Sequence, residues 1–143
     1  MTIITQQKVT VRVPATSANC GPGFDALGLA VTLYNTFTYE VLPRDQLELT
    51  VEGQGAGFMK ASPRNLAFLS FFKLWDKVGA ERVGLKVHMQ NNIPLSRGLG
   101  SSSSAIVAGL MAANALTGNT CSQADLIALA TEIEGHPDNV APA

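Results

Sequence analysis

Residues 94–104 read PLSRGLGSSSS, and this stretch decides the architecture because it joins a strand pattern to a helix pattern. Before it, apolar and polar residues alternate from Val83 to Gln90, which predicts a strand. After it, an almost entirely apolar run reaches Leu116 and predicts a helix that is buried on most sides. A glycine-rich loop that leads from a strand into a helix is a typical binding site for an anion.

The loop has two features that suit a phosphate group. Gly98 and Gly100 permit backbone conformations closed to other residues, so that consecutive N–H groups can turn toward one anion. The helix adds the positive end of its dipole, and Ser101–Ser104 add hydroxyls for phosphate oxygens or Mg²⁺. The alternative is a plain connecting turn with Ser101 as an ordinary N-cap. Four serines exceed what one cap needs, so the pattern favours phosphate binding, although the Lys-Ser/Thr pair of a Walker loop is missing.

The remaining periodicity predicts an α+β fold, with a mainly antiparallel sheet, helices on one face and the phosphate-binding loop opening a buried helix. Ser62 is the predicted N-cap of an earlier helix, with Pro63 as its first residue. Ser122 and Asp125 resemble the capping box of a last helix. Further strands are predicted over residues 9–13, 26–42 (one or two strands) and 47–52.

Composition limits the classes of protein to which the chain can belong. The chain has 143 residues, 46% of them hydrophobic and 15% charged, with a formal net charge of −1, which fits one globular domain. No basic stripe points to a nucleic acid or to an anionic membrane. Cys20 and Cys121 make neither a disulfide framework nor a zinc site, and the N-terminus lacks a signal-peptide pattern. We expect a cytoplasmic protein, and we expect these residues to be the N-terminal part of a longer chain.

A second candidate cluster surrounds the Gly-Pro-Gly turn at residues 21–23. Asn19 and Asp25 flank this rigid turn, which can hold an amide and a carboxylate at a fixed separation. The carboxylate can bind an ammonium group, and the amide a carboxylate or a hydroxyl. Alternatively, both are turn residues that bond to their own backbone. The residues alone leave both interpretations open.

A third candidate cluster ends the chain. Glu132 lies beside the apolar face of the last predicted helix, so we expect it, rather than Glu134, to be the buried carboxylate. A buried carboxylate needs a partner, and a Mg²⁺ shared with phosphate would supply one; the alternative is a solvated helix end. His136, Asp138 and Asn139 follow in a proline-stiffened turn, which is a candidate substrate rim. His88, by contrast, is expected to face solvent from its strand.

Three segments, taken in order, resemble the motifs of the GHMP kinase superfamily. They are PATSAN (14–19) with GPGFDALG (21–28), then IPLSRGLGSS (93–102), and last EGHPDNVAP (134–142). The third is similar to the segment that sets homoserine kinases apart from other members of the superfamily. The resemblance spans nearly the whole chain.

The resemblance implies ATP-dependent phosphorylation of the L-homoserine hydroxyl, giving O-phospho-L-homoserine on the way to threonine. The alternatives are another small-molecule GHMP kinase, or a non-catalytic fragment that binds nucleotide or self-associates. The implied ATP contacts are Pro94, Leu95, Ser96, Arg97, Gly98, Leu99, Gly100, Ser101, Ser102, Ser103 and Ser104, with Asn65 at the adenine. The implied catalytic residues are Glu132, Asp138 and Asn139, the Mg²⁺ ligands are Ser102 and Glu132, and the homoserine site holds Asn19, Asp25, His136, Asp138 and Asn139.

Two departures from the superfamily pattern stand out. Ser103 and Ser104 continue the serine run where the superfamily usually has alanines. The chain also lacks the second half of the superfamily, which carries another glycine-rich motif and substrate-contacting arginines. We therefore expect one N-terminal ATP-binding domain over residues 1–143, inactive or feeble by itself, and the resemblance leaves a homodimer open.

Overall fold

The elements follow the predicted order, with most strands first and two helices last. The computed structural model describes residues 7–17, 29–53, 56–57, 59–92 and 101–134. The elements are β1 (Lys8–Ser17), β2 (Leu29–Leu42), β3 (Leu47–Gly53), α1 (Leu66–Lys77), β4 (Gly84–Asn91), α2 (Ser101–Leu116) and α3 (Gln123–Glu134). The second strand region is therefore one long strand rather than two.

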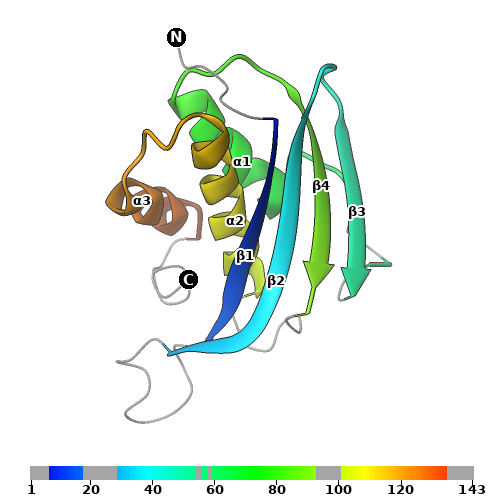
Figure 1. The fold of residues 1–143 in the computed structure, drawn as a ribbon, viewed down its shortest axis with the longest axis vertical. Coiled ribbons are helices and arrows are strands. Elements are labelled where there is room, and N and C mark those ends of the chain that lie inside the picture. The colour runs from blue at the N-terminus through cyan, green and yellow to red at the C-terminus, as the bar shows by residue number, and fades with distance from the viewer. Residues whose placement is uncertain (1–6, 18–28, 54–55, 58, 93–100, 135–143) are drawn as a thin grey trace.

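The four strands form one mixed sheet in the order β1-β2-β4-β3, side by side in Figure 1. The pairs β1–β2 and β2–β4 are antiparallel, whereas β3 runs parallel to β4. Parallel strands begin at the same end of the sheet, so the chain must cross back between them, and α1 lies in that connection. The α+β fold and the mainly antiparallel sheet are thus confirmed.

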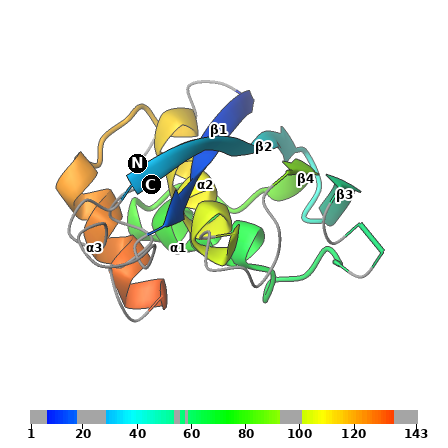
Figure 2. The ribbon, with the colours of Figure 1, turned by 90° about the horizontal axis from the view of Figure 1, so that it is seen from below.

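The described helices gather on one side of the sheet, which Figure 2 shows from below. In that layer α2 packs against both α1 and β1, and α3 packs on α2. Gly109 marks the closest approach of α1 and α2. A Cβ atom on it would lie 2.0 Å from Ser70 Oγ and 2.9 Å from the Ala67 carbonyl oxygen. Only a residue without a side chain fits there, because packed helices leave no spare volume.

An aromatic stack links the sheet to α1. The Tyr39 and Phe71 rings are stacked with centroids 5.5 Å apart, and Phe71 stacks in turn on Trp75 at 5.0 Å. The Tyr39 hydroxyl donates to the Ala67 carbonyl oxygen at 3.4 Å. Complete burial raises the pKa of this phenol far above its ordinary value, because the charged form would lose its hydration. Tyr39 is therefore a neutral core residue.

The start of α1 differs from the prediction. The N-cap is Asn65, whose side-chain oxygen accepts from the Ala67 N–H at 2.9 Å, and the helix begins at Leu66. Ser62 instead accepts from the Arg64 N–H at 3.1 Å, in a turn that precedes the helix. Both residue types are good caps, and the sequence pattern selected the earlier one. The predicted end is confirmed, since Gly79 follows the helix with φ +76°.

The capping box of α3 is confirmed. The Ser122 hydroxyl accepts from the Asp125 N–H at 3.2 Å, and the Asp125 carboxylate accepts from the Ser122 N–H at 3.0 Å. These bonds from Ser122, the backbone one first, lower the pKa of the Asp125 carboxyl below its usual value. The connection between α2 and α3 is thus fixed by its own side chains.

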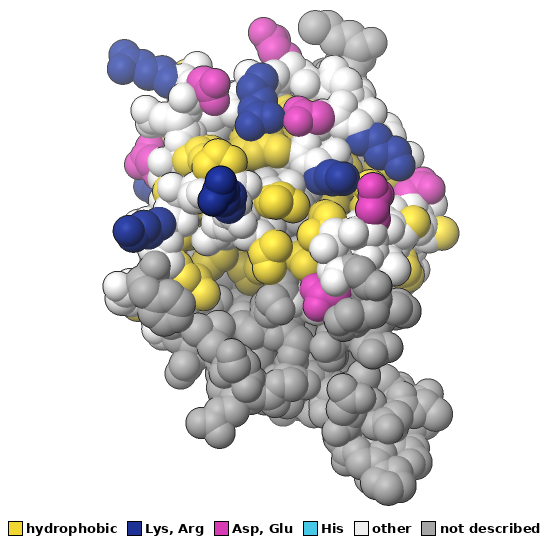
Figure 3. All heavy atoms as spheres, turned by 180° about the vertical axis from the view of Figure 1, so that it is seen from behind, with side chains coloured by type: hydrophobic (Ala, Val, Ile, Leu, Met, Phe, Trp, Pro, Cys, Tyr) yellow, Lys and Arg dark blue, Asp and Glu magenta, His cyan; other side chains and the backbone are white. Residues whose placement is uncertain are grey.

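The helix side of the molecule shows apolar side chains framed by charged ones (Figure 3). Leu126 and Ile133 of α3 are partly buried and pack against the core. Within the described residues, Met111 is the one exposed large hydrophobic side chain, at 41%. No described helix is long and apolar enough to cross a membrane.

Candidate functional site

At the lower end of the molecule in Figure 1, β1 ends and β2 begins, whereas β4 ends beside the middle of β2. The register shows both points, because Thr16 of β1 pairs with Ala30 of β2, and Asn91 of β4 pairs with Asn35, further along β2. The first turn of α2 reaches Asn35 through Ser104. The first two sequence motifs connect these same element ends. Several predicted site residues lie outside the described residues: Asn19, Asp25, residues 94–100, His136, Asp138 and Asn139.

The first turn of α2 holds a buried hydroxyl without a partner. Helix α2 begins at Ser101, so the serine run predicted to belong to the loop forms the first turn of the helix, and Ser103 is 1% exposed. Its Oγ is the one buried side-chain N or O atom in the described part of the chain that makes no hydrogen bond. Leaving such a group unpaired costs about 1–3 kcal/mol, so most buried polar groups find a partner. An unpaired hydroxyl at the head of a helix is therefore a candidate ligand contact.

The neighbouring hydroxyl belongs to a buried polar bridge. The Asn35 side-chain amide donates from Nδ2 to Ser104 Oγ at 3.2 Å, and its Oδ1 accepts from the Asn92 N–H at 2.8 Å. Asn35 is 1% exposed and Ser104 is fully buried. The bridge thus connects the strand β2, the residue that follows β4 and the first turn of α2.

Asn35 was missed by the sequence analysis, although the sequence carries a signal for it. It occupies the same alternating face of β2 as Phe37 and Tyr39, which both point into the core. An asparagine on the apolar face of a strand must find hydrogen-bond partners inside the protein. That requirement makes a buried asparagine a candidate for bridging two segments of chain.

The opposite end of α2 has a similar bridge. The Asn114 Nδ2 donates to the Cys121 carbonyl oxygen at 3.1 Å, and its Oδ1 accepts from the Cys121 N–H at 3.0 Å. Thr117 is 2% exposed, and its hydroxyl donates to the Ala113 carbonyl oxygen at 2.7 Å. This end closes the connection to α3 with bonds from the chain itself.

The predicted burial of Glu132 is wrong. Its side chain is 63% exposed, and its Oε1 lies 3.7 Å from the Lys73 ammonium nitrogen of α1. Leu129 is buried, but Glu132 lies three residues further along α3 and falls at the solvent edge of that helix face. Its sequence position beside apolar residues therefore did not fix its burial. The role of Glu132 as a metal ligand is a separate matter and stays a prediction.

Asn65 has a structural task at the start of α1. Besides capping the helix, its Nδ2 donates to the Lys60 carbonyl oxygen at 3.4 Å. Both polar atoms of the amide thus have partners within the chain. The predicted contact of Asn65 with adenine stays a prediction.

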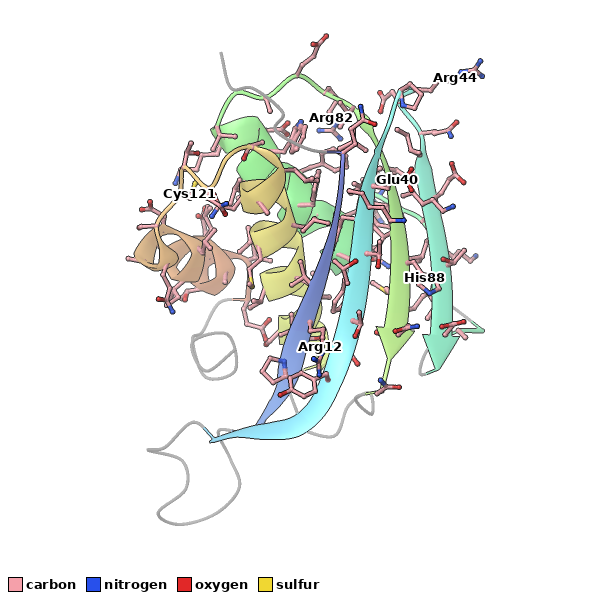
Figure 4. The ribbon with its side chains drawn as sticks, in the orientation of Figure 1. Arg12, Glu40, Arg44, Arg82, His88 and Cys121 are labelled. Carbon is pink, nitrogen blue, oxygen red and sulfur yellow. The ribbon has the colours of Figure 1, made fainter. Side chains whose placement is uncertain are left out.

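The open face of the sheet carries a shallow hollow of about 320 Å³, away from α2. Its lining is Lys8, Thr38, Glu40, Thr50, Lys86 and His88. The register places Glu40 between Lys8 and Lys86, so charges alternate across the strands. His88 faces outward as predicted, with Nε2 3.5 Å from Glu52 Oε2 (Figure 4). This face has no marked excess of positive charge that would attract a nucleotide, and the described residues contain no group of three metal-binding side chains.

Comparison with known proteins decides the family. The sequence pattern of the GHMP kinases N terminal domain matches residues 65–143, more than half of the chain. The chain belongs to the GHMP kinase family. A structure of homoserine kinase from Cytophaga hutchinsonii superposes with a TM-score of 0.81 at 29% identity, covering 96% of this chain and 46% of that one. Mevalonate kinase from Methanococcus jannaschii shares the fold, with a TM-score of 0.69 at 18% identity over 92% of this chain and 48% of that one.

Two curated relatives of the chain are named homoserine kinase. A homoserine kinase of Carboxydothermus hydrogenoformans is 49% identical over 135 residues, which cover 94% of this chain and 44% of the relative. A homoserine kinase of a Synechococcus strain is 49% identical over 136 residues, which cover 95% of this chain and 44% of the relative. The chain therefore spans less than half the length of the curated relatives that it matches.

Proposed function

We propose that the protein is an ATP-dependent kinase that phosphorylates the hydroxyl of L-homoserine to give O-phospho-L-homoserine. The similarity to proteins named homoserine kinase, at 49% identity over nearly the whole chain, supports the choice of substrate. The resemblance of residues 134–142 to the homoserine kinase segment supports the same choice. On this proposal the reaction belongs to threonine biosynthesis in the cytoplasm.

The single structural observation that carries the proposal is the unpaired Ser103 hydroxyl in the first turn of α2. A phosphate oxygen can accept a hydrogen bond from this hydroxyl, and the N–H groups of the same turn favour negative charge beside them. We assign the triphosphate of ATP to this position, held by residues 94–104. Phosphoryl transfer depends mainly on positioning and on neutralising charge, which is what a helix N-terminus supplies.

Mg²⁺ is proposed to bind through Ser102 and Glu132. When bound, it would supply positive charge that offsets the negative charge of the phosphate groups. The exposed Glu132 carboxylate is available to such an ion only if it leaves Lys73, and an exposed pair of this kind is weak, typically about 0–1 kcal/mol.

The proposed homoserine site uses the other two motifs. Homoserine is a zwitterion with a hydroxyl group. Asp25 is proposed to accept from its ammonium group, and Asn19 to donate to its carboxylate. Asp138 and Asn139 are proposed to orient the hydroxyl beside His136. We assign Asp138 to orientation first and leave its action as a base to experiment.

The substrate is tested with the full gene product in an ATP-consumption assay. Homoserine, mevalonate and galactose are compared as acceptors at equal concentration. We expect turnover with homoserine and only background with the other two. Turnover of mevalonate without turnover of homoserine would overturn the proposal, while the family assignment would stand.

The position of the nucleotide is tested by Gly100→Phe in the same full-length protein. A bulky side chain at a glycine that allows a close approach of backbone to phosphate should abolish ATP binding, by about a hundredfold or more in the dissociation constant. Thermal stability serves as the control for folding. Unchanged ATP affinity in a folded variant would show that the nucleotide binds elsewhere.

A further inference from the structure

The buried bridge of Asn35 brackets the proposed phosphate-binding segment. Asn92 is the last described residue before residues 93–100, and Ser104 lies in the first helical turn after them. One planar amide touches both, at 2.8 Å from the Asn92 nitrogen and 3.2 Å from Ser104 Oγ. A single side chain therefore links the residue that follows β4 to the first turn of α2.

Burial strengthens the bridge between Asn35 and Ser104. Asn35 is 1% exposed and Ser104 is fully buried, so water does not compete for the bond between them, whereas Asn92 is exposed. A hydrogen bond inside the protein is stronger than one in water, and its loss leaves a polar group unsatisfied. Asn35 is itself held in the centre of the sheet, paired with Val13 of β1 on one side and Asn91 of β4 on the other.

We infer that Asn35 is a positioning residue for the nucleotide: its amide ties Asn92 to the first turn of α2 and so fixes the place of that helix N-terminus for the phosphates of ATP. The inference rests on the proposed nucleotide site. Fixing a binding group in advance improves affinity because less ordering is left to occur on binding. Ser104, which stands where the superfamily usually has alanine, ties the helix end of the segment to this amide in the present chain.

The bridge at the other end of α2 provides a matched control. Asn114 is also buried, at 6% exposed, and its two amide atoms also hold a connecting segment, through the backbone of Cys121. It differs from Asn35 in lying at the far end of a 16-residue helix. Leucine replaces asparagine with similar volume and without any hydrogen-bonding group, so the same substitution is made at both positions.

The experiment compares Asn35→Leu, Ser104→Ala and Asn114→Leu with the unaltered full gene product. Mg·ATP dissociation constants are measured by titration calorimetry, alongside KM for ATP, KM for homoserine, kcat and thermal unfolding. We expect Asn35→Leu to raise the dissociation constant and KM for ATP by about tenfold, and Ser104→Ala by about threefold, because it removes one half of the bridge. Asn114→Leu should lower stability comparably and change ATP affinity by less than about twofold.

The outcomes separate this inference from the proposed function. If the unaltered protein does not bind ATP, the nucleotide assignment fails. If it binds ATP and the dissociation constants of Asn35→Leu and Ser104→Ala are unchanged, the positioning role is overturned and the kinase proposal stands. Equal weakening by Asn35→Leu and Asn114→Leu would also overturn it, because a general loss of folding would explain both. Should Asn35→Leu fail to fold, an unchanged dissociation constant in Ser104→Ala overturns the inference and a raised one supports it.

Discussion

The two ends of α2 differ in one respect: the N-terminal end holds a buried hydroxyl without a partner. At the C-terminal end, the Thr117 hydroxyl donates to the Ala113 carbonyl oxygen, and Asn114 holds the backbone of Cys121 on both sides. At the N-terminal end, the Ser103 hydroxyl is buried and makes no hydrogen bond within the described part of the chain. We call the C-terminal end finished, because its buried hydroxyl is paired within the chain. We call the N-terminal end unfinished, because the Ser103 hydroxyl is left as a donor for a group outside the chain.

The difference has an energetic consequence. A satisfied buried hydroxyl contributes about 1 kcal/mol to stability, whereas an unsatisfied one lowers stability until a ligand pairs with it. Natural proteins break local rules of this kind mainly at functional sites. We therefore expect substitutions at the C-terminal end to lower stability, and loss of the Ser103 hydroxyl at the N-terminal end to lower nucleotide affinity.

The largest expected effect comes from the middle of α2, which supports both ends. Gly109→Val places atoms where Ser70 Oγ and the backbone of α1 already lie. Overpacking at such a helix contact should cost about 3 kcal/mol of unfolding free energy. Denaturant unfolding measures it, with Met111→Ala on the exposed side of the same helix as a control that changes stability by less than about 1 kcal/mol. Equal stability of both variants would contradict the close contact of α1 and α2.

The next largest effect on stability is expected for Asn114→Leu, which alters only the finished end. It leaves the N–H and carbonyl of Cys121 without their present partner, which should cost about 2 kcal/mol. Chemical denaturation of the full gene product measures the loss. A loss of less than about 0.5 kcal/mol would mean that water replaces the amide and that this end is not closed by the side chain.

Ser122→Ala tests the connection that follows the finished end. It removes the hydroxyl that caps α3 at the Asp125 N–H, with an expected loss of about 1 kcal/mol and no change in ATP affinity. Ser122→Thr keeps an oxygen acceptor and should recover most of that stability. If the threonine variant were as unstable as the alanine variant, the cap would not be the cause.

The smallest expected effect is a change in pH dependence. The pKa of Asp125 is lowered in the folded protein, so its contribution to stability is present above the unfolded pKa of about 4 and disappears as pH falls through the folded pKa. Asp125→Asn should therefore reduce the stability lost between neutral pH and acid. Thermal unfolding at pH 7 and pH 3 measures this, and an unchanged difference between the two pH values would contradict the assigned hydrogen bonds.

Most of the fold was predictable because it follows from periodicity. The alternation from Val83 to Gln90, the apolar run of α2 and the capping box of α3 each fix one element locally. The start of α1 was not predicted, since Ser62 and Asn65 can both cap and the choice depends on the turn that precedes the helix.

The candidate site was less predictable, because its important features are contacts between distant segments. The burial of Glu132 depended on how α3 sits against α1 and α2, and Lys73 is 59 positions earlier in the chain. Asn35 is 69 positions from Ser104 and 57 from Asn92, so no local pattern connects them. The sequence predicted the kind of loop, and the structure added what holds its ends.

The most direct test of the comparison is a pair of hydroxyl deletions, Ser103→Ala and Thr117→Val, in the full gene product. Both hydroxyls are buried at the ends of the same helix, Ser103 in its first turn and Thr117 directly after its last residue, and they differ in being unpaired or paired. Mg·ATP dissociation constants and thermal unfolding are measured for each. We predict that Ser103→Ala keeps or raises stability and weakens ATP binding about tenfold, while Thr117→Val loses about 1 kcal/mol of stability and binds ATP normally. A loss of stability without any loss of ATP affinity in Ser103→Ala would contradict the account.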